Sequence, residues 1–329
     1  MSLNILFVGG TGQISLPCVA DAVSKGHKVS VFNRGKRGEA LPEGVESIVG
    51  DMTDVEAYRA LGRRGFDVVA QFMVFTPEQL QADLDAFTGH TGQYVYISSA
   101  SVYEKPASHY VISEDKTPAV NPYWPYSQAK IACEQLLQGQ TALPWTIVRP
   151  SHTVRSGLPT MMNEGDMIAR RMLEGKPVIV AGDGTSPWTL TRSEDFAKPF
   201  TGLLGNKAAL SDIFHITSDR GFGWDQIYRA IARGLGVEAK IVHVPTDTLI
   251  AYKPDWIGPL LGDKTWAALF DNSKVKRVAG DFTCSHDLDE ILSEPVRYVK
   301  QRLAAGAGAP NGLEGLYERI AAEQSALGR

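Results

Sequence analysis

The sequence predicts an α/β fold, in which a doubly wound parallel sheet is joined to a second, smaller α/β lobe. The first 150 residues alternate short apolar runs with amphipathic stretches, and near-continuous apolar strands are typical of a parallel sheet covered by helices on both faces. The chain has 329 residues, of which 43% are hydrophobic and 21% charged. A globular chain of this length is longer than a single hydrophobic core usually supports, which favours two associated lobes.

Strands and helices alternate regularly up to Pro150. Apolar, β-branched or aromatic runs predict strands at Leu3–Val8, Val29–Phe32, Val45–Val49, Asp67–Phe75, Tyr94–Ser98 and Trp145–Val148. Amphipathic stretches predict helices at Gln13–Ser24, Val55–Leu61, Pro77–Phe87 and Tyr126–Leu137. Each predicted helix separates two predicted strands, which is the βαβ pattern of a parallel sheet.

A glycine turn lies directly between the first predicted strand and the first predicted helix, in Gly9-Gly10-Thr11-Gly12-Gln13-Ile14-Ser15. Glycines at this place let backbone N–H groups approach a pyrophosphate, and the helix N-terminus adds partial positive charge. The alternative is an ordinary tight strand-to-helix turn. We predict that the turn binds a dinucleotide through Gly9, Thr11, Gly12, Gln13 and Ile14.

The rhythm loosens after Pro150, where the chain predicts a second lobe. We expect a helix near Met161–Leu173, strands at Pro177–Val180 and Ile213–Ile216, a helix over Trp224–Leu235 ended by Gly234 or Gly236, a flexible joint at Ala304–Gly312 and a last helix at about Leu313–Ala326. Residues 1–155 are therefore expected to form the dinucleotide-binding domain, to which segments at about 185–220 return. Residues 156–329 are expected to form mainly the substrate-binding lobe and the C-terminal helix.

Composition excludes several other classes of protein. A net charge of −4 argues against nucleic acid or anionic lipid as the main partner, because both require a basic face. No apolar run approaches the ~20 residues that span a bilayer. The three cysteines are far apart in the chain and odd in number, so no disulfide framework is expected. The histidines lack the spacing of a metal site, so no metal is expected. The first residues lead directly into a strand rather than a secretory signal, and we expect a cytoplasmic protein.

Three cations follow the second predicted strand, in Asn33-Arg34-Gly35-Lys36-Arg37. An NAD-specific fold usually places an acidic residue here to accept hydrogen bonds from the adenosine ribose. Arginine can instead hold a 2′-phosphate, because its guanidinium group makes bidentate contacts. The alternative is a solvated basic loop. We predict that Asn33, Arg34 and Arg37 contact the cofactor, NAD or NADP, with Arg34 favouring NADP.

Asp51 follows the third predicted strand, within Gly50-Asp51-Met52. Its carboxylate could accept a hydrogen bond from an adenine amino group. Aspartate after a strand is also common turn chemistry, which is the alternative interpretation. We predict Asp51 and Met52 as cofactor contacts.

Tyr126 and Lys130 indicate catalysis. A spacing of four residues places both side chains on one face of a helix. A nearby ammonium group favours the phenolate and lowers the tyrosine pKa from its usual ~10, so that the tyrosine can transfer a proton at neutral pH. Ser99 follows the fifth predicted strand, and ligands of open parallel sheets bind beyond the C-terminal ends of the strands. We expect Ser99 to hold a substrate oxygen while Tyr126 moves its proton.

The chain resembles the extended short-chain dehydrogenase/reductase family, in its NAD-dependent epimerase/dehydratase group. The motifs that carry the resemblance extend over about residues 3–300, and they are Gly9-x-x-Gly12, Gly50-Asp51, Ser98-Ser99-Ala100-Ser101-Val102-Tyr103, Tyr126-x-x-x-Lys130, Val148-Arg149-Pro150, Gly182-Asp183-Gly184-Thr185, Glu194-Asp195-Phe196-Ala197 and Asp271-Asn272-Ser273-Lys274. The resemblance implies a Rossmann domain that binds NAD(P), a smaller C-terminal substrate lobe, and a homodimer built through two helices of each subunit.

Residue by residue, the resemblance implies that Tyr126 is the acid/base, Lys130 its electrostatic partner and ribose ligand, and Ser99 the family's Ser/Thr position. It places Pro150 and His152 where the loop after the sixth strand meets the nicotinamide, with His152 also facing substrate. Phe72 falls where strand four of the family ends beside the cofactor, although the family usually has small residues there. A lone loop histidine is more often a packing residue, which is the alternative for His152.

The substrate lobe departs from the nucleotide-sugar epimerases. Trp188 stands where UDP-galactose 4-epimerase and its relatives have a phosphate-binding arginine, and Leu260–Lys264 contains no arginine at the place of a second one. A pyrophosphate without these cations would be poorly held, although Lys253 and Lys264 could compensate. The departures favour a free sugar, polyol or sugar acid as substrate, on which Trp188 could stack, unless it belongs to the core of the lobe.

We therefore expect an NAD(P)-dependent epimerase or dehydrogenase that acts on a sugar-like hydroxyl by hydride transfer, with Ser99, Tyr126 and Lys130 as its catalytic set. The alternative is a non-catalytic relative, either a dinucleotide-sensing regulator or an RNA-binding protein such as the chloroplast stem-loop-binding proteins. The intact Ser-Tyr-Lys set and the acidic chain argue against this alternative.

Overall fold

A computed structural model describes residues 2–36, 40–306 and 312–327. Its main sheet has seven parallel strands in the order β10-β6-β5-β4-β1-β2-β3. The strands are β1 Asn4–Val8, β2 Lys28–Asn33, β3 Glu46–Val49, β4 Phe66–Gln71, β5 Thr91–Ile97, β6 Trp145–Pro150 and β10 Asp212–Ile216. The predicted doubly wound parallel sheet is confirmed.

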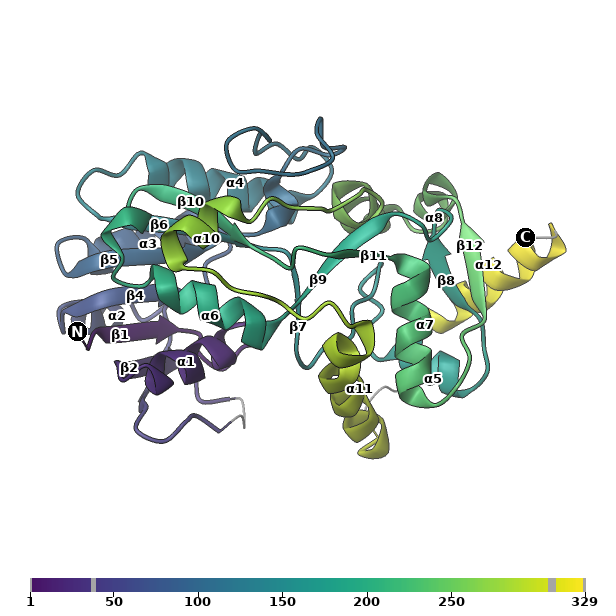
Figure 1. The fold of residues 1–329 in the computed structure, drawn as a ribbon, viewed down its shortest axis with the longest axis horizontal. Helices are drawn as coiled ribbons and strands as arrows, with labels where there is room; N and C mark the ends of the chain where they lie inside the picture. Colours follow the sequence, from purple (N-terminus) through teal and green to yellow (C-terminus); the bar gives the residue numbers. More distant parts are fainter. Residues whose placement is uncertain (1, 37–39, 307–311, 328–329) are drawn as a thin grey trace.

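Helices cover both faces of this sheet (Figure 1). On one face lie α1 Ser15–Ser24, α6 Ser193–Leu203 and α10 Ser273–Ala279, and on the other lie α2 Val55–Gly62, α3 Pro77–Phe87 and α4 Pro125–Gln138. Strand β10 and helices α6 and α10 come from the later part of the chain, so the chain returns to the first sheet after leaving it.

The second lobe lies beside the carboxyl ends of the sheet strands and contains two small sheets, β11-β9-β7 and β12-β8. Its strands are β7 His152–Val154, β8 Val178–Ala181, β9 Pro187–Arg192, β11 Gly221–Gly223 and β12 Ile241–Val244. Its helices are α5 Met167–Leu173, α7 Trp224–Leu235, α8 Thr246–Tyr252, α9 Ile257–Pro259, α11 Leu288–Ala304 and α12 Glu314–Ala326. Short turns are η1 Ala100–Val102, η2 Lys207–Ala209, η3 Pro254–Trp256 and the π-helical η4 Leu260–Lys264.

Most predicted elements agree with the structure to within about three residues at each end, and two differ by more. The fourth strand ends at Gln71 rather than Phe75, because the Gln71 side chain accepts a hydrogen bond from the backbone N–H of Met73 and turns the chain towards α3. Helix α5 begins at Met167 rather than near residue 161, because Asn163 and Gly165 have left-handed backbone angles, with φ of 61° and 63°.

The structure tests one of two boundary predictions in the second lobe. Helix α7 ends at Gly236, whose φ of 85° is the left-handed C-cap that favours glycine. The predicted joint at 304–312 falls largely on residues 307–311, which lie outside the described residues. Among the described helices, none is long and apolar enough to cross a membrane.

Candidate active site

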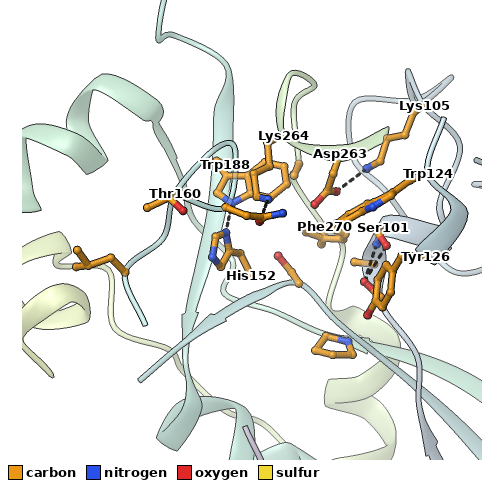
Figure 2. Close-up of a pocket in the computed structure, with 17 residues that line it drawn as sticks. Ser101, Lys105, Trp124, Tyr126, His152, Thr160, Trp188, Asp263, Lys264 and Phe270 are labelled. Atoms are coloured by element: carbon orange, nitrogen blue, oxygen red, sulfur yellow. Dashed lines mark hydrogen bonds and ion pairs between the residues drawn. The ribbon is translucent and has the colours of Figure 1, made fainter. Parts of the chain in front are cut away.

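A cavity of about 300 Å³ opens at the carboxyl edge of the main sheet, between the sheet and the second lobe (Figure 2). Its walls come from the segments after β5 and β6, from the start of α4, and from the irregular segments near residues 160 and 265. The lining residues are Ser99, Ala100, Ser101, Lys105, Trp124, Tyr126, Pro150, Ser151, His152, Leu158, Thr160, Asn163, Trp188, Asp263, Lys264, Ala268 and Phe270. Residues from both lobes therefore share one cavity.

Ser99 lies at this cavity because it caps the turn that follows β5. Its Oγ accepts a hydrogen bond from the backbone N–H of Ser101 at 3.1 Å and donates to Ser101 Oγ at 2.9 Å. The Ser127 hydroxyl donates to the same Ser101 Oγ at 2.8 Å. This chain of hydroxyls fixes Ser99 against the first turn of α4.

Tyr126 lies in the first turn of α4, after Pro125, which occupies the position where a helix has no N–H to lose. Its ring packs 5.0 Å from the Trp124 ring, and Ser99, which lines the same cavity, lowers the Tyr126 pKa. The structure thus brings two of the predicted catalytic residues to the wall of one cavity.

Lys130 is buried one turn further along α4 and differs from the prediction. Its Nζ donates to the carbonyl oxygens of Val74 at 2.7 Å and Ile97 at 2.8 Å, and it lies 6.0 Å from the Tyr126 ring centroid. Burial lowers the pKa of Lys130 to about 8. The expectation that this ammonium group lowers the Tyr126 pKa is wrong for this structure: burial raises the pKa of Tyr126, and the neighbouring Ser99 opposes that rise.

His152 is held by Trp188. The Trp188 indole Nε1 donates to His152 Nδ1 at 3.0 Å, which places the imidazole proton on Nε2. Burial lowers the pKa of His152 to about 3, with a further contribution from the charge of Lys264. The Trp188 ring itself is 3% exposed and stacks on Trp224 with centroids 5.3 Å apart. Trp188 therefore borders the cavity mainly as a core residue that orients His152.

The glycine turn between β1 and α1 is tightly folded. Gly9 has φ of 84°, and a Cβ there would lie 2.4 Å from Met73 Cγ. Ser15 replaces the third glycine and ties the turn together, since its Oγ donates to Gly9 O at 2.6 Å and accepts from Gly12 N at 2.8 Å. No side chain caps the N-terminus of α1 at Ile14, so this end of the helix suits a phosphate.

Other predicted cofactor residues around the turn are placed as follows. Thr11 is buried in the turn. The Gln13 side chain joins the two lobes instead of projecting freely, because it donates to Thr153 O at 2.7 Å and accepts from Gly157 N at 2.8 Å. The Phe72 ring turns into the core, where it stacks on Phe7 at 6.2 Å. Pro150 ends β6 at the cavity wall.

The predicted adenosine end is built from two turns. Asn33 Oδ1 accepts from Gly35 N at 2.7 Å, and Arg34 is exposed. Asp51 accepts from the Thr53 N–H and hydroxyl, which lowers the Asp51 pKa. Met52 packs partly buried against the core. Arg37 lies outside the described residues.

Sequence reasoning missed several residues of the cavity wall. Lys105 and Trp124 lie in segments that no motif marked, and Asp263 was considered only as part of an arginine-free stretch. No local pattern distinguishes such residues from loop residues, since the turns that carry them are irregular. Within the described residues, no group of three or more His, Cys, Asp or Glu side chains could hold a metal ion.

The fold and the glycine turn place the protein in a known class. Residues 5–216 match the NAD dependent epimerase/dehydratase family, and the chain belongs to that family.

Three known proteins illustrate the similarity. The chain is 30% identical over 256 residues to the chloroplast stem-loop binding protein of 41 kDa b of Arabidopsis thaliana, a match that covers 73% of this chain and 65% of that protein. It is 24% identical over 334 residues to the 2'-dehydrokanamycin reductase of Streptomyces kanamyceticus, covering 99% of this chain and 93% of the reductase. The structure of UDP-glucose 4-epimerase from Bifidobacterium longum with NAD+ and UDP shares the fold, with a TM-score of 0.72, 18% identity and coverage of 91% and 98%.

Proposed function

We propose that this protein transfers hydride between a nicotinamide dinucleotide and a hydroxyl-bearing carbon of a sugar or sugar-like substrate. The observation that carries this proposal is that Ser99 and Tyr126 line the same cavity, with Lys130 beside Tyr126. The two hydroxyls lie beyond the carboxyl end of β5, where ligands of open parallel sheets bind. Membership of the NAD-dependent family supplies the cofactor class.

The roles follow from the positions of the side chains. Ser99 Oγ holds the substrate hydroxyl oxygen, and Tyr126 as phenolate accepts the hydroxyl proton while the carbon loses hydride, so that an alcohol becomes a carbonyl. Burial raises the pKa of Tyr126 and so opposes the phenolate, and Ser99 is the neighbour that lowers this pKa. Lys130, whose Nζ lies 6.0 Å from the Tyr126 ring centroid, is left with the role of ribose ligand. A bound dinucleotide supplies the hydride acceptor. If the carbonyl compound stays and is reduced on its other face, the net reaction is epimerisation, and if it leaves, the protein is a dehydrogenase.

The residues of the first domain fit a dinucleotide. The uncapped N-terminus of α1 and the turn at Gly9 would hold the pyrophosphate, and Lys130 would reach the nicotinamide ribose. We propose NADP as the preferred form, because Arg34 is exposed and no carboxylate side chain ends β2. Near-stoichiometric NAD in the purified protein, identified by mass spectrometry after denaturation, would contradict this preference and favour a cofactor recycled within an epimerase.

Substitution of Tyr126 by Phe tests the acid/base role. Tyr126→Phe is expected to lower turnover by about 10²- to 10⁴-fold, the usual contribution of a positioned proton donor, while leaving dinucleotide binding unchanged. Tyr123→Phe is the matched control, because Tyr123 is close in sequence and is not part of the cavity wall. Full turnover in Tyr126→Phe would remove the proposed acid/base. Absence of hydride transfer in wild type with every sugar and sugar acid tried would refute the function.

RNA binding is the second candidate, and the similarity to a chloroplast stem-loop binding protein is the observation that favours it. An RNA-binding protein would show an affinity that falls steeply as salt rises, since phosphate contacts release counterions. Binding of a stem-loop RNA with this salt dependence, together with no hydride transfer, would replace the enzymatic proposal.

Two further properties belong to this proposal. The resemblance to the family favours a homodimer, and the molar mass in solution by light scattering tests it against 35.8 kDa for one chain. The three cysteines are free and buried, which favours a cytoplasmic location, where thiols stay reduced. Microscopy of the tagged protein in its own cell tests the location.

A further inference from the structure

Two buried lysines border the cavity. Lys105 and Lys264 are each 6% exposed, although lysine is almost never buried unless it is paired. Burial lowers the pKa of both, because the ammonium form loses its hydration. Holding two such groups in a cavity wall costs free energy, so their retention at the candidate active site calls for a ligand that offsets that cost.

The charges on the cavity wall do not balance. Lys105, Asp263 and Lys264 are the charged residues among those that line it, and His152 is neutral because its pKa is about 3. Lys105 Nζ lies 3.6 Å from Asp263 Oδ1 (Figure 2), so this pair is neutral as a whole. Lys264 makes no ion pair with any carboxylate of the described residues. The wall therefore carries one surplus positive charge, on Lys264.

The hydrogen bonds of Lys264 are also incomplete. Its ammonium group can donate three hydrogen bonds, but the structure gives one long bond, to Asn163 Oδ1 at 3.4 Å. Asp263 and the nearby Glu164 both attract Lys264 without forming an ion pair with it. Asp263 is already paired with Lys105, and the Glu164 carboxylate does not line the cavity and accepts hydrogen bonds from Met162 N at 2.6 Å and from the Tyr317 hydroxyl at 2.7 Å. Two donors of a buried cation therefore remain for a ligand.

The segment that carries Lys264 is built to hold it there. Residues 260–264 form a π-helical turn, a rare geometry that frequently occurs at functional sites. Gly258 and Gly262 let this turn lie against Trp124, since a Cβ on Gly258 would lie 2.5 Å from Trp124 Cδ1 and a Cβ on Gly262 would lie 2.8 Å from Trp124 Cβ. Asn121 Nδ2 joins Gly262 O to Ser101 O, with 2.7 Å to each. The cation is thus fixed relative to the segment that carries Ser99.

The cation and the proposed proton donor border the same indole ring. Lys264 Nζ lies 5.8 Å from the Trp124 ring centroid, and the Tyr126 ring lies 5.0 Å from it. One small ligand can therefore place a hydroxyl at Tyr126 and an anionic group at Lys264. A single surplus charge matches a monoanion, whereas a pyrophosphate would bring more negative charge than the wall compensates.

We propose that the substrate is a sugar acid, whose carboxylate binds Lys264 while a hydroxyl of the same molecule meets Ser99 and Tyr126. This inference rests on the proposed function and names the substrate class of that site. It makes Lys264 a specificity-determining residue that separates this protein from enzymes that hold a nucleotide diphosphate with arginines.

A binding experiment on the full-length protein saturated with dinucleotide tests the proposal. The probes are glucuronate, galacturonate and gluconate, compared with neutral glucose and galactose, and with glucose 6-phosphate and UDP-glucose as the phosphate-bearing alternatives. Calorimetry should show that at least one carboxylate probe binds more tightly than every neutral and phosphorylated probe. Lys264→Gln should weaken that binding by about 10- to 100-fold, the effect of removing a hydrogen bond to a charged group, and Lys264→Arg should restore part of it.

Lys253→Gln is the matched control, because Lys253 is a partly exposed lysine of the same lobe that pairs with Asp255 at 3.0 Å and does not line the cavity. Unchanged dinucleotide affinity and thermal unfolding of Lys264→Gln would show that the variant is folded. Three results would each overturn the proposal. They are equal binding of carboxylates by wild type and Lys264→Gln, tighter binding of a phosphorylated or neutral probe, and no carboxylate binding at millimolar concentration.

The readouts separate this proposal from the proposed function. Hydride transfer is monitored by nicotinamide absorbance. If the protein transfers hydride with a neutral sugar and Lys264→Gln does so equally well, the sugar-acid proposal is overturned and the proposed function stands. Carboxylate binding that depends on Lys264, without hydride transfer to any probe, would retain the anion site and refute the function.

Discussion

A buried carboxylate, Asp83, gives a prediction about stability that depends on pH. The side chain lies under the main sheet and accepts hydrogen bonds from the Tyr58 hydroxyl at 2.9 Å, Gln71 Nε2 at 2.5 Å and the Tyr94 hydroxyl at 2.5 Å. Burial raises its pKa from 3.8 to about 6 in spite of these three bonds. The folded state therefore binds a proton at Asp83 more tightly than the unfolded chain does.

The size and sign of the effect follow from this difference. A pKa raised by about two units corresponds to about 3 kcal/mol at 1.36 kcal/mol per unit. Because the folded pKa is the higher one, the contribution is fully present below pH ~4 and is lost as pH rises through about 6. Asp83→Asn cannot titrate, so the stability of wild type relative to this variant should fall by about 2.4 kcal/mol between pH 4 and pH 7.

Denaturant unfolding of wild type and Asp83→Asn over this pH range measures the difference directly, and the titration of all other groups is common to both proteins. Asp85→Asn is the matched control, since Asp85 lies on the exposed side of the same helix and pairs with Arg59 at 3.2 Å. A wild-type-minus-Asp83→Asn difference that stays constant with pH, or that grows in favour of wild type as pH rises, would refute the reasoning.

Two further predictions concern the cofactor turn and the cavity. Ser15→Gly restores a third glycine but removes two hydrogen bonds inside the turn. We therefore expect it to lower the free energy of unfolding by about 1–3 kcal/mol, measured with denaturant, and to weaken dinucleotide binding, measured by titration. Ser24→Gly, in the same helix, is the control, and equal stability of the two variants would contradict this expectation. His152 should remain neutral between pH 5 and 8, with its proton on Nε2, because its pKa is about 3 and Trp188 donates to Nδ1. Nitrogen chemical shifts of its ring report this, and an imidazolium signal at pH 5 would disprove it.

The sequence is sufficient for most of the first domain because hydrophobic burial there acts on contiguous segments. Strands such as Ile5–Val8 are buried on both faces, so their apolar runs are unambiguous. The end of β4 was mispredicted because Phe72 and Val74 continue the apolar pattern, while the hydrogen bond from Met73 N to the Gln71 side chain ends the strand. That bond depends on Asp83 orienting the Gln71 amide, which is a tertiary contact and leaves no local pattern.

The candidate site also contains residues that the sequence predicts and residues that it does not. Ser99, Tyr126 and Pro150 meet because parallel strands end at one edge of the sheet, and motifs after those strands are recognisable in sequence. The charged wall could not be predicted as a unit, because Lys105 and Lys264 lie far apart in the chain and meet only through irregular turns. Burial, which decides their chemical meaning, is a property of the folded lobes.

The contacts of Lys130 connect the candidate site to the buried core of the first domain. Its ammonium group is held by the carbonyl oxygen of Val74, and the segment that presents this carbonyl leaves β4 through the hydrogen bond between Met73 N and Gln71. Because Asp83 fixes Gln71 from below the sheet, a buried network of the core sets the position of a residue beside Tyr126. A substitution at Asp83 is therefore expected to alter the environment of Lys130 as well as stability, and the pH dependence of turnover in Asp83→Asn reports that second effect.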